Sequence, residues 1–206
     1  FEVSITENSS EPQTWRVFVD REFTAKLRIV KKDADTGNVV LVPNAEFKIY
    51  NVDTKEYVEM ITTYPSKEVH TSFFTDEDGD LILPDVLSVG TYRIEEVSAP
   101  YGYLLNDDFL TVKIDSDTFH KVDYDTNEAI ITVMYEDTAV VGKLTVEKRG
   151  EVLTGYKMGQ FVYEEQPLMG AKFNIYAAED IYTSDGQKNE NGERIILYEA
   201  GELIDT

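Results

Sequence analysis

Short segments in which apolar and polar residues alternate recur along this chain. The clearest are KLRIVK at 26–31, EFKIY at 46–50, DLIL at 80–83, TYRIEE at 91–96, LTVKI at 110–114 and IITVMY at 130–135. A period of two residues places successive side chains on opposite faces of a strand, so each segment predicts a strand with one buried face. Clusters of turn-forming residues, such as DADTGN at 33–38, separate these segments. The sequence therefore predicts an all-β fold, an antiparallel β-sandwich.

An internal repeat divides the chain into units. The hexapeptide AEFKIY at 45–50 recurs as AKFNIY at 171–176. Each copy follows a strand that ends in lysine, Lys31 in the first case and Lys148 in the second. The same structural unit therefore begins twice, which predicts tandem domains.

The ends of these units repeat as well. An aspartate closes an apolar alternating strand eleven residues before each lysine: Asp20 precedes Lys31, and Asp137 precedes Lys148. We therefore expect three parts, of which only the second is complete. They are residues 1–24 as the C-terminal tail of one domain, residues 25–140 as a whole domain, and residues 141–206 as the N-terminal part of a third.

The composition narrows the environment and the partners. With 40 acidic and 19 basic residues, the formal net charge is −21, which repels nucleic acid and anionic membrane surfaces. Without cysteine, the chain has neither disulfides nor thiolate metal sites. It contains no apolar run long enough to span a membrane and no signal peptide, so we expect an internal segment of a larger protein.

The motifs of the second unit follow a recognisable order. They are KKD at 31–33, TG at 36–37, AEF at 45–47, TDEDG at 75–79, GTY at 90–92, Glu96 and APYGY at 99–103. This ordered set resembles the SpaA/Cna-B domain of Gram-positive surface and pilus proteins, and its first half returns in the third unit. The resemblance implies a prealbumin-like sandwich of about seven strands. One departure is Asn44, where the family usually has glycine, and it affects a turn only.

The resemblance also implies chemistry within the domain. Domains of this type often form an intramolecular isopeptide bond between a lysine of the first strand and an asparagine or aspartate of the last, assisted by a glutamate. These roles fall on Lys31, Asp137 and Glu96, and an aspartate acceptor would release water instead of ammonia. Lys148 and Asp20 hold the corresponding positions in the partial units, where their partners would lie outside this chain.

The residue pattern supports the same three positions independently of the resemblance. Lys31, Glu96 and Asp137 each share the parity of the apolar residues in their own strands, so all three should point into the core. Burial raises the pKa of a carboxyl group and lowers that of an amine. A neutral amine is a nucleophile, and a protonated glutamate could polarise the aspartate carbonyl and shuttle protons.

Other interpretations remain open. The three residues could form a buried salt-bridge network without covalent chemistry. Lys32 would replace Lys31 if a one-residue bulge reversed the parity of the strand. The acidic run 76–80 could hold calcium, although it also fits an acidic hairpin turn, and we predict no metal site. His70 and His120 lack a nearby nucleophile, which argues against a hydrolase triad.

These observations predict a structural stalk or pilin segment of an extracellular, cell-wall-anchored protein, with neighbouring domains or pilus subunits as partners. The alternative is an adhesin module, in which exposed aromatic residues such as Tyr101, Tyr103 and Tyr182 contact a host matrix protein or glycan. Neither function requires a cofactor, and we expect no enzymatic turnover of an external substrate.

Overall fold

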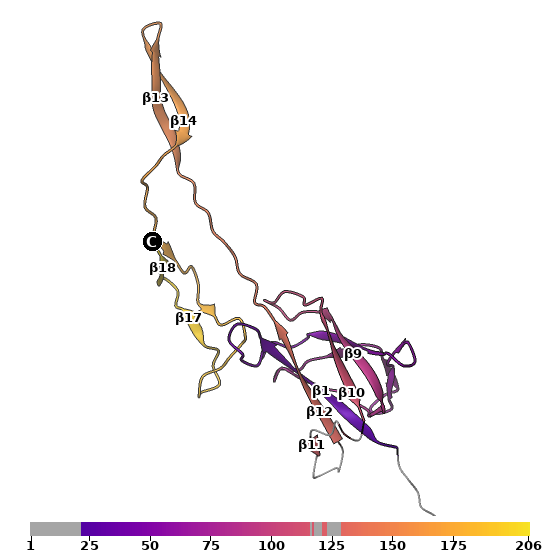
Figure 1. Ribbon diagram of the computed structural model, residues 1–206. Coiled ribbons are helices and arrows are strands. Elements are labelled where there is room, and N and C mark those ends of the chain that lie inside the picture. The colour runs from indigo at the N-terminus through magenta and orange to yellow at the C-terminus, as the bar shows by residue number, and fades with distance from the viewer. Residues whose placement is uncertain (1–21, 116, 118–120, 123–128) are drawn as a thin grey trace, which may run out of the picture.

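The computed structural model describes residues 22–115, 117, 121–122 and 129–206. Two facing sheets form a sandwich (Figure 1). The first sheet has the order β11 (Lys121–Val122), β12 (Ala129–Asp137), β1 (Thr24–Asp33) and β7 (Asp80–Ile82), and β8 (Leu87–Ser88) also pairs with β1. The second has the order β10 (Phe109–Ile114), β9 (Gly90–Ser98), β2 (Glu46–Asn51) and β3 (Glu56–Tyr57), and β6 (Phe73–Phe74) also pairs with β2. A separate hairpin joins β4 (Met60–Thr62) to β5 (Glu68–His70).

The first and last long strands of the sandwich are neighbours. β1 pairs with β12 in parallel, in an unbroken register from Lys26 opposite Ile130 to Asp33 opposite Asp137. The remaining strand pairs of the described residues are antiparallel, as the sequence predicts. Because β1 and β12 run in the same direction, the start of one and the end of the other lie at opposite ends of the sheet.

Alternate side chains of β1, β2, β9 and β12 fill the space between the sheets. The largest of these buried side chains are Leu27, Ile29, Phe47, Ile49, Tyr92, Ile94, Ile131 and Tyr135. Burial of each such side chain contributes about 1.5–3 kcal/mol to stability. If the pairing of any strand slipped by one residue, these side chains would point toward solvent, so the apolar pattern fixes the register.

Asn44 occupies a turn that requires an unusual backbone. Its φ is 73°, in the left-handed region that glycine and, among other residues, asparagine adopt most readily. Its backbone N–H donates a 3.0 Å hydrogen bond to the carbonyl of Thr75. Asparagine can therefore replace glycine at this position, because it adopts the backbone conformation that the turn requires.

The acidic run 76–80 is a tight turn. One carboxylate oxygen of Asp76 accepts hydrogen bonds from the backbone N–H groups of Asp78 and Asp80, both at 3.0 Å. The turn leads from β6 in the second sheet to β7 in the first, so it joins the sheets and is not the hairpin turn expected from the sequence. Among the described residues, no three histidine, aspartate or glutamate side chains are arranged to hold a metal ion.

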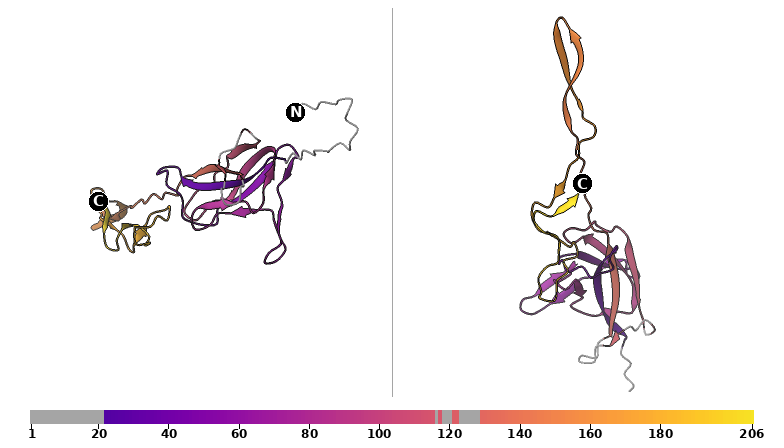
Figure 2. Two further views of the ribbon diagram at one scale, coloured as in Figure 1. Left: turned by 90° about the horizontal axis from the view of Figure 1, so that it is seen from below. Right: turned by 90° about the vertical axis from the view of Figure 1, so that its left-hand side faces the viewer.

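Residues 141–206 build smaller sheets. The hairpin of β13 (Arg149–Lys157) and β14 (Gln160–Pro167) projects away from the sandwich (Figures 1 and 2). Two further pairs are β15 (Ile175–Tyr176) with β18 (Leu203–Asp205), and β16 (Ile181–Tyr182) with β17 (Ile196–Tyr198). Across the described part of the chain, no helix combines the length and apolar character that a bilayer crossing needs.

Gly79 is a position where the fold depends on the absence of a side chain. Its φ is 74°, and a Cβ atom there would overlap the carbonyl oxygen of Val40. Gly37 has a similar φ of 72° but open space around it. We expect Gly79→Ala to lower the free energy of unfolding by about 1–3 kcal/mol more than Gly37→Ala, measured by urea denaturation. Equal losses would show that only the backbone conformation matters.

Candidate functional site

Three strands bring one lysine and two carboxylic acids into the core. Lys31 on β1 lies opposite Tyr135 in the parallel ladder, so Asp137, two residues further along β12, projects from the same face of the first sheet. Glu96 on β9 pairs with Phe47 in the second sheet and faces them from the other side. The site therefore spans the interior of the sandwich.

The three side chains are in contact and hidden from solvent. Lys31 Nζ donates a 2.6 Å hydrogen bond to Glu96 Oε1 and lies 2.5 Å from Asp137 Oδ1. All three side chains have an exposed fraction of 0%. An unpaired ion in such a place would cost several kcal/mol, so the amine and the carboxylates depend on one another.

The contact between Lys31 and Asp137 differs in kind from the contact with Glu96. Its length is that of an ion pair, and neither buried carboxylate oxygen of Asp137 has a hydrogen-bond partner. The carboxyl group is thus close to the amine without being held in a stable hydrogen-bonded arrangement. Proximity of this kind is the first requirement for bond formation between the two groups.

The charges of the three groups do not balance when all are ionised, because two negative charges face one positive charge. Burial raises the pKa of Asp137 to about 7, helped by the nearby charge of Glu96 and opposed by Lys31. Protonation of Asp137 leaves the group of three electrically neutral. The same protonated carboxyl is the form that can lose its hydroxyl group as water.

Aromatic rings enclose the amine. The Lys31 Nζ atom lies 4.4 Å from the centre of the Tyr135 ring and 5.6 Å from that of Phe47. The two rings contact each other edge to face, with their centres 5.0 Å apart. They exclude water from the site, and a low local dielectric strengthens every polar contact within it.

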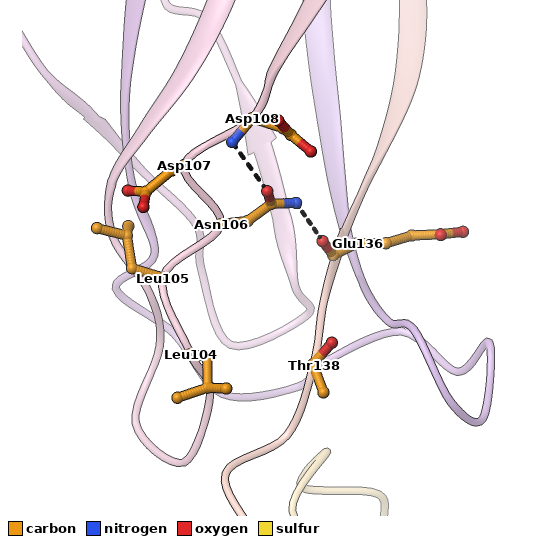
Figure 3. A pocket seen from close by; sticks show the side chains of 7 residues that line it. All are labelled: Leu104, Leu105, Asn106, Asp107, Asp108, Glu136 and Thr138. Atoms are coloured by element: carbon orange, nitrogen blue, oxygen red, sulfur yellow. Dashed lines mark hydrogen bonds between the residues drawn. The ribbon is translucent and has the colours of Figure 1, made fainter.

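A loop between β9 and β10 fixes the far side of Glu96. The backbone N–H of Asn106 donates a 3.1 Å hydrogen bond to Glu96 Oε2, and its side-chain amide donates one of 2.9 Å to the carbonyl of Glu136 (Figure 3). The Tyr135 hydroxyl donates to the carbonyls of Asn106 at 3.2 Å and Asp108 at 2.5 Å. The loop is thus anchored to β12 at Asn106, which contacts Glu96, and at Asp108.

Several predicted residues lie elsewhere. Lys32 points away from the core and donates a 3.0 Å hydrogen bond to the carbonyl of Gly37, and the unbroken register of β1 contains no bulge that would exchange it with Lys31. Lys148 is exposed in the segment before β13. Asp20 and His120 lie outside the described residues.

The aromatic residues assigned to the adhesin alternative do not form one exposed set. Tyr101 is 92% exposed, and Tyr182 is 39% exposed. Tyr103 is only 6% exposed, so the expectation that it is an exposed aromatic residue is wrong. Its hydroxyl instead donates a 2.8 Å hydrogen bond to the buried carboxylate of Asp33.

Two parts of this arrangement were missed by the strand pattern. Asn106 lies in a turn cluster, LLNDD at 104–108, where no periodicity indicates which group points inward. Asp33 was recognised only as part of a motif, yet its carboxylate accepts hydrogen bonds from the backbone of Asp35 and Thr36 as well as from Tyr103. These bonds together lower the pKa of Asp33, although its burial acts in the opposite direction.

The Tyr135 hydroxyl allows the loop to be tested separately from the aromatic enclosure. Tyr135→Phe keeps the ring beside Lys31 but removes the donor to the carbonyls of Asn106 and Asp108. We expect a loss of about 1–2 kcal/mol in the free energy of unfolding and faster hydrogen exchange at the Asn106 amide. Tyr57→Phe, which removes an exposed hydroxyl, is the control. Unchanged exchange at Asn106 would contradict the anchoring role.

The variant Lys31→Met removes the amine and tests how its charge affects the pKa of Asp137. The nearby charge of Lys31 lowers the pKa of Asp137, so its loss should raise that pKa above about 7, as measured by carbon-13 NMR titration. A folded-state pKa above the ordinary value of 3.8 means that the folded protein binds the extra proton. The contribution of Asp137 to stability is therefore complete below pH 3.8, and it is lost as the pH rises through the pKa of Asp137 in the folded protein. Stability that increases over this pH range would contradict it.

The family comparison agrees with this architecture. The SpaA family, described as a prealbumin-like fold domain, matches residues 25–128. Comparison with curated protein sequences gives no match. Similar solved structures include the minor pilin GBS52 of Streptococcus agalactiae, with 16% identity, a TM-score of 0.45, and coverage of 62% of this chain and 49% of that one.

Two other solved structures show a comparable level of similarity to this chain. Domains D2 and D3 of the major pilin SpaD of Corynebacterium diphtheriae share 20% identity at a TM-score of 0.43, covering 57% of this chain and 48% of that one. The shaft pilin of Lactobacillus rhamnosus GG shares 20% identity at a TM-score of 0.39, covering 60% of this chain and 48% of that one. The chain thus spans about half the length of these structures. Because the family match covers half of the sequence, the chain belongs to the SpaA family of prealbumin-like fold domains.

Proposed function

We propose that this chain is a stalk segment of a Gram-positive cell-surface protein or pilus, in which an amide bond between Lys31 and Asp137 links the first and last strands of the sandwich. In this proposal residues 25–140 form one complete domain, and residues 1–24 and 141–206 belong to its neighbours. The protein is extracellular and anchored to the cell wall, and its partners are neighbouring domains or subunits.

One observation supports the covalent bond above all. The amine of Lys31 lies 2.5 Å from an oxygen of Asp137 and 2.6 Å from Glu96, inside a core from which solvent is excluded. Fixed placement of two reacting groups can correspond to an effective molarity of about 10⁵–10⁸ M. A condensation that is slow in water can therefore proceed once within a folded domain.

The reaction balances without any added reagent. An ammonium and a carboxylate hold the same protons as a neutral amine and a carboxylic acid, so a proton transfer prepares both reactants. The nitrogen lone pair of Lys31 then attacks Cγ of Asp137, and Glu96 takes a proton from the nitrogen and gives one to the departing hydroxyl group. The products are one secondary amide and one water, and Glu96 returns to its original state.

The strand arrangement gives this bond a mechanical role. Lys31 lies late in β1 and Asp137 is the last residue of the adjacent parallel strand, so tension entering at Thr24 would cross the amide at Asp137 and pass directly into the residues that follow β12. The long chain between the two residues would be bypassed. By analogy with disulfides, closing a loop of about 100 residues stabilises the fold by roughly 4–5 kcal/mol. A chain without cysteine would gain a covalent cross-link in this way.

The competing interpretations make different predictions. A salt-bridge network would leave the mass of the protein unchanged. An adhesin would need a receptive surface, and within the described residues the set of three tyrosines assigned to it is reduced to Tyr101 and Tyr182. We therefore favour the stalk.

Intact-mass spectrometry of the full 206-residue chain tests the bond. We expect the mass to be one water below the value calculated from the sequence, and a cross-linked peptide containing Lys31 and Asp137 after digestion. Lys31→Ala, Asp137→Ala and Glu96→Ala should each restore the full mass, the last because proton transfer fails.

Two variants sharpen the result. Asp137→Asn should still form the bond but lose ammonia instead of water, which identifies the acyl donor. Lys32→Ala should behave like the unchanged protein. A full, uncondensed mass in the unchanged protein would overturn the covalent proposal and leave a buried ionic network.

A further inference from the structure

A turn in the C-terminal part of the chain docks on the loop that follows β1. The turn comprises residues 183–187 between β16 and β17, and the loop comprises residues 38–42 (Figure 1). The backbone N–H of Leu41 donates a 2.7 Å hydrogen bond to the carbonyl of Asp185. The side-chain amide of Gln187 donates one of 2.6 Å to the carbonyl of Val39, and that of Asn38 donates one of 3.0 Å to Asp185 Oδ2.

The turn is shaped for this contact. Asp185 is only 4% exposed, although most side chains around it are open to solvent. Its Oδ1 accepts a hydrogen bond from the backbone N–H of Gln187 and so stabilises the turn, while Oδ2 is left to receive Asn38. Gly186 has a φ of 71°, and a Cβ atom there would lie 3.3 Å from the backbone carbonyl of Leu41. The close approach of the two backbones therefore depends on this glycine.

The loop that receives the turn is held firmly by the sandwich. Val40 is completely buried, and its backbone N–H donates a 2.9 Å hydrogen bond to the carbonyl of Lys31. The backbone N–H of Asp33 donates to the carbonyl of Asn38 at 2.9 Å. The docking turn thus contacts a fixed extension of β1.

The covalent connection between the two parts would not fix their orientation alone. After β12 the chain makes one bridge, between Ala139 and Tyr103, and Val140 donates to the carbonyl of Gly102 at 2.8 Å. Residues 141–148 are then exposed and outside any strand of the structure. An extended, solvated connection of this kind normally allows neighbouring domains to reorient.

We propose that residues 183–187 form an intramolecular clasp that fixes the C-terminal part of the chain on the sandwich. The clasp converts a flexible connection into a rigid joint, so that successive units of the protein keep one relative angle. Its specificity comes from two side-chain amides and one backbone pair, and the carboxylate of Asp185 is the charged group among them. The clasp is independent of the Lys31–Asp137 bond and could exist without it.

Distance measurement between spin labels tests the clasp in the full 206-residue chain. Because the protein has no cysteine, Thr111→Cys and Glu179→Cys place one label on an exposed position of each part. We expect a single narrow distance distribution. Gly186→Val should broaden it, because the added side chain would press on Leu41 and separate the backbones.

Gly192→Val is the matched control. Gly192 also has a positive φ of 81°, but no atom lies within 4 Å of the Cβ position, so it introduces similar backbone strain away from the joint. The control should keep the narrow distribution. A broad distribution in the unchanged chain, or equal broadening by both variants, would overturn the proposal.

A second variant avoids any change of backbone strain. Gln187→Ala removes only the amide that donates to Val39, and hydrogen exchange at the Leu41 amide should accelerate on the order of tenfold. Exchange at Ile29, in the core of β1, should not change, which shows that the sandwich remains folded. Unaltered exchange at Leu41 would contradict a role for Gln187 in the clasp.

Discussion

The contact of one buried amine with two buried carboxyl groups constrains the rest of the sandwich. Lys31, Asp137 and Glu96 come from three strands in two sheets, and each lowers the free-energy cost of burying the others. The parallel register of β1 and β12 and the inward face of β9 must therefore agree to within a single residue. The aromatic pair beside the amine excludes the water that would otherwise weaken this contact.

β1 also connects the site to the remainder of the chain. Its inner face presents Lys31 to the core, and its last residue, Asp33, accepts hydrogen bonds from Tyr103 and from the turn that follows. The loop beyond that turn receives Asp185 and Gln187 of the C-terminal part. A proposed covalent link and a proposed clasp therefore act on the same strand, one within the sandwich and one at its end. In the proposed stalk function, both would contribute to rigidity under tension.

How far the sequence predicts the site depends on the type of element that holds each residue. Strand parity places Lys31, Glu96 and Asp137 inward because a period of two residues leaves only two possible faces. The role of Asn106 and the burial of Tyr103 could not be predicted, since turns lack such a period and their side chains are directed by contacts from distant segments. Whether the amine and the acid have condensed is a question of covalent chemistry, and it stays a prediction.

The two copies of the repeated hexapeptide show what the sequence determined and what depended on the tertiary structure alone. Its alternation specifies strand character in both copies, and the ordered motifs specify the family. Yet Phe47 of the first copy is completely buried, whereas Phe173 of the second is 40% exposed. β2 lies between β9 and β6 under a second sheet, while the described part of the second copy pairs only with β18. Local pattern sets which side chains can face a core, but burial is a property of the neighbouring strands, because apolar surface is removed from water only by other surface that covers it.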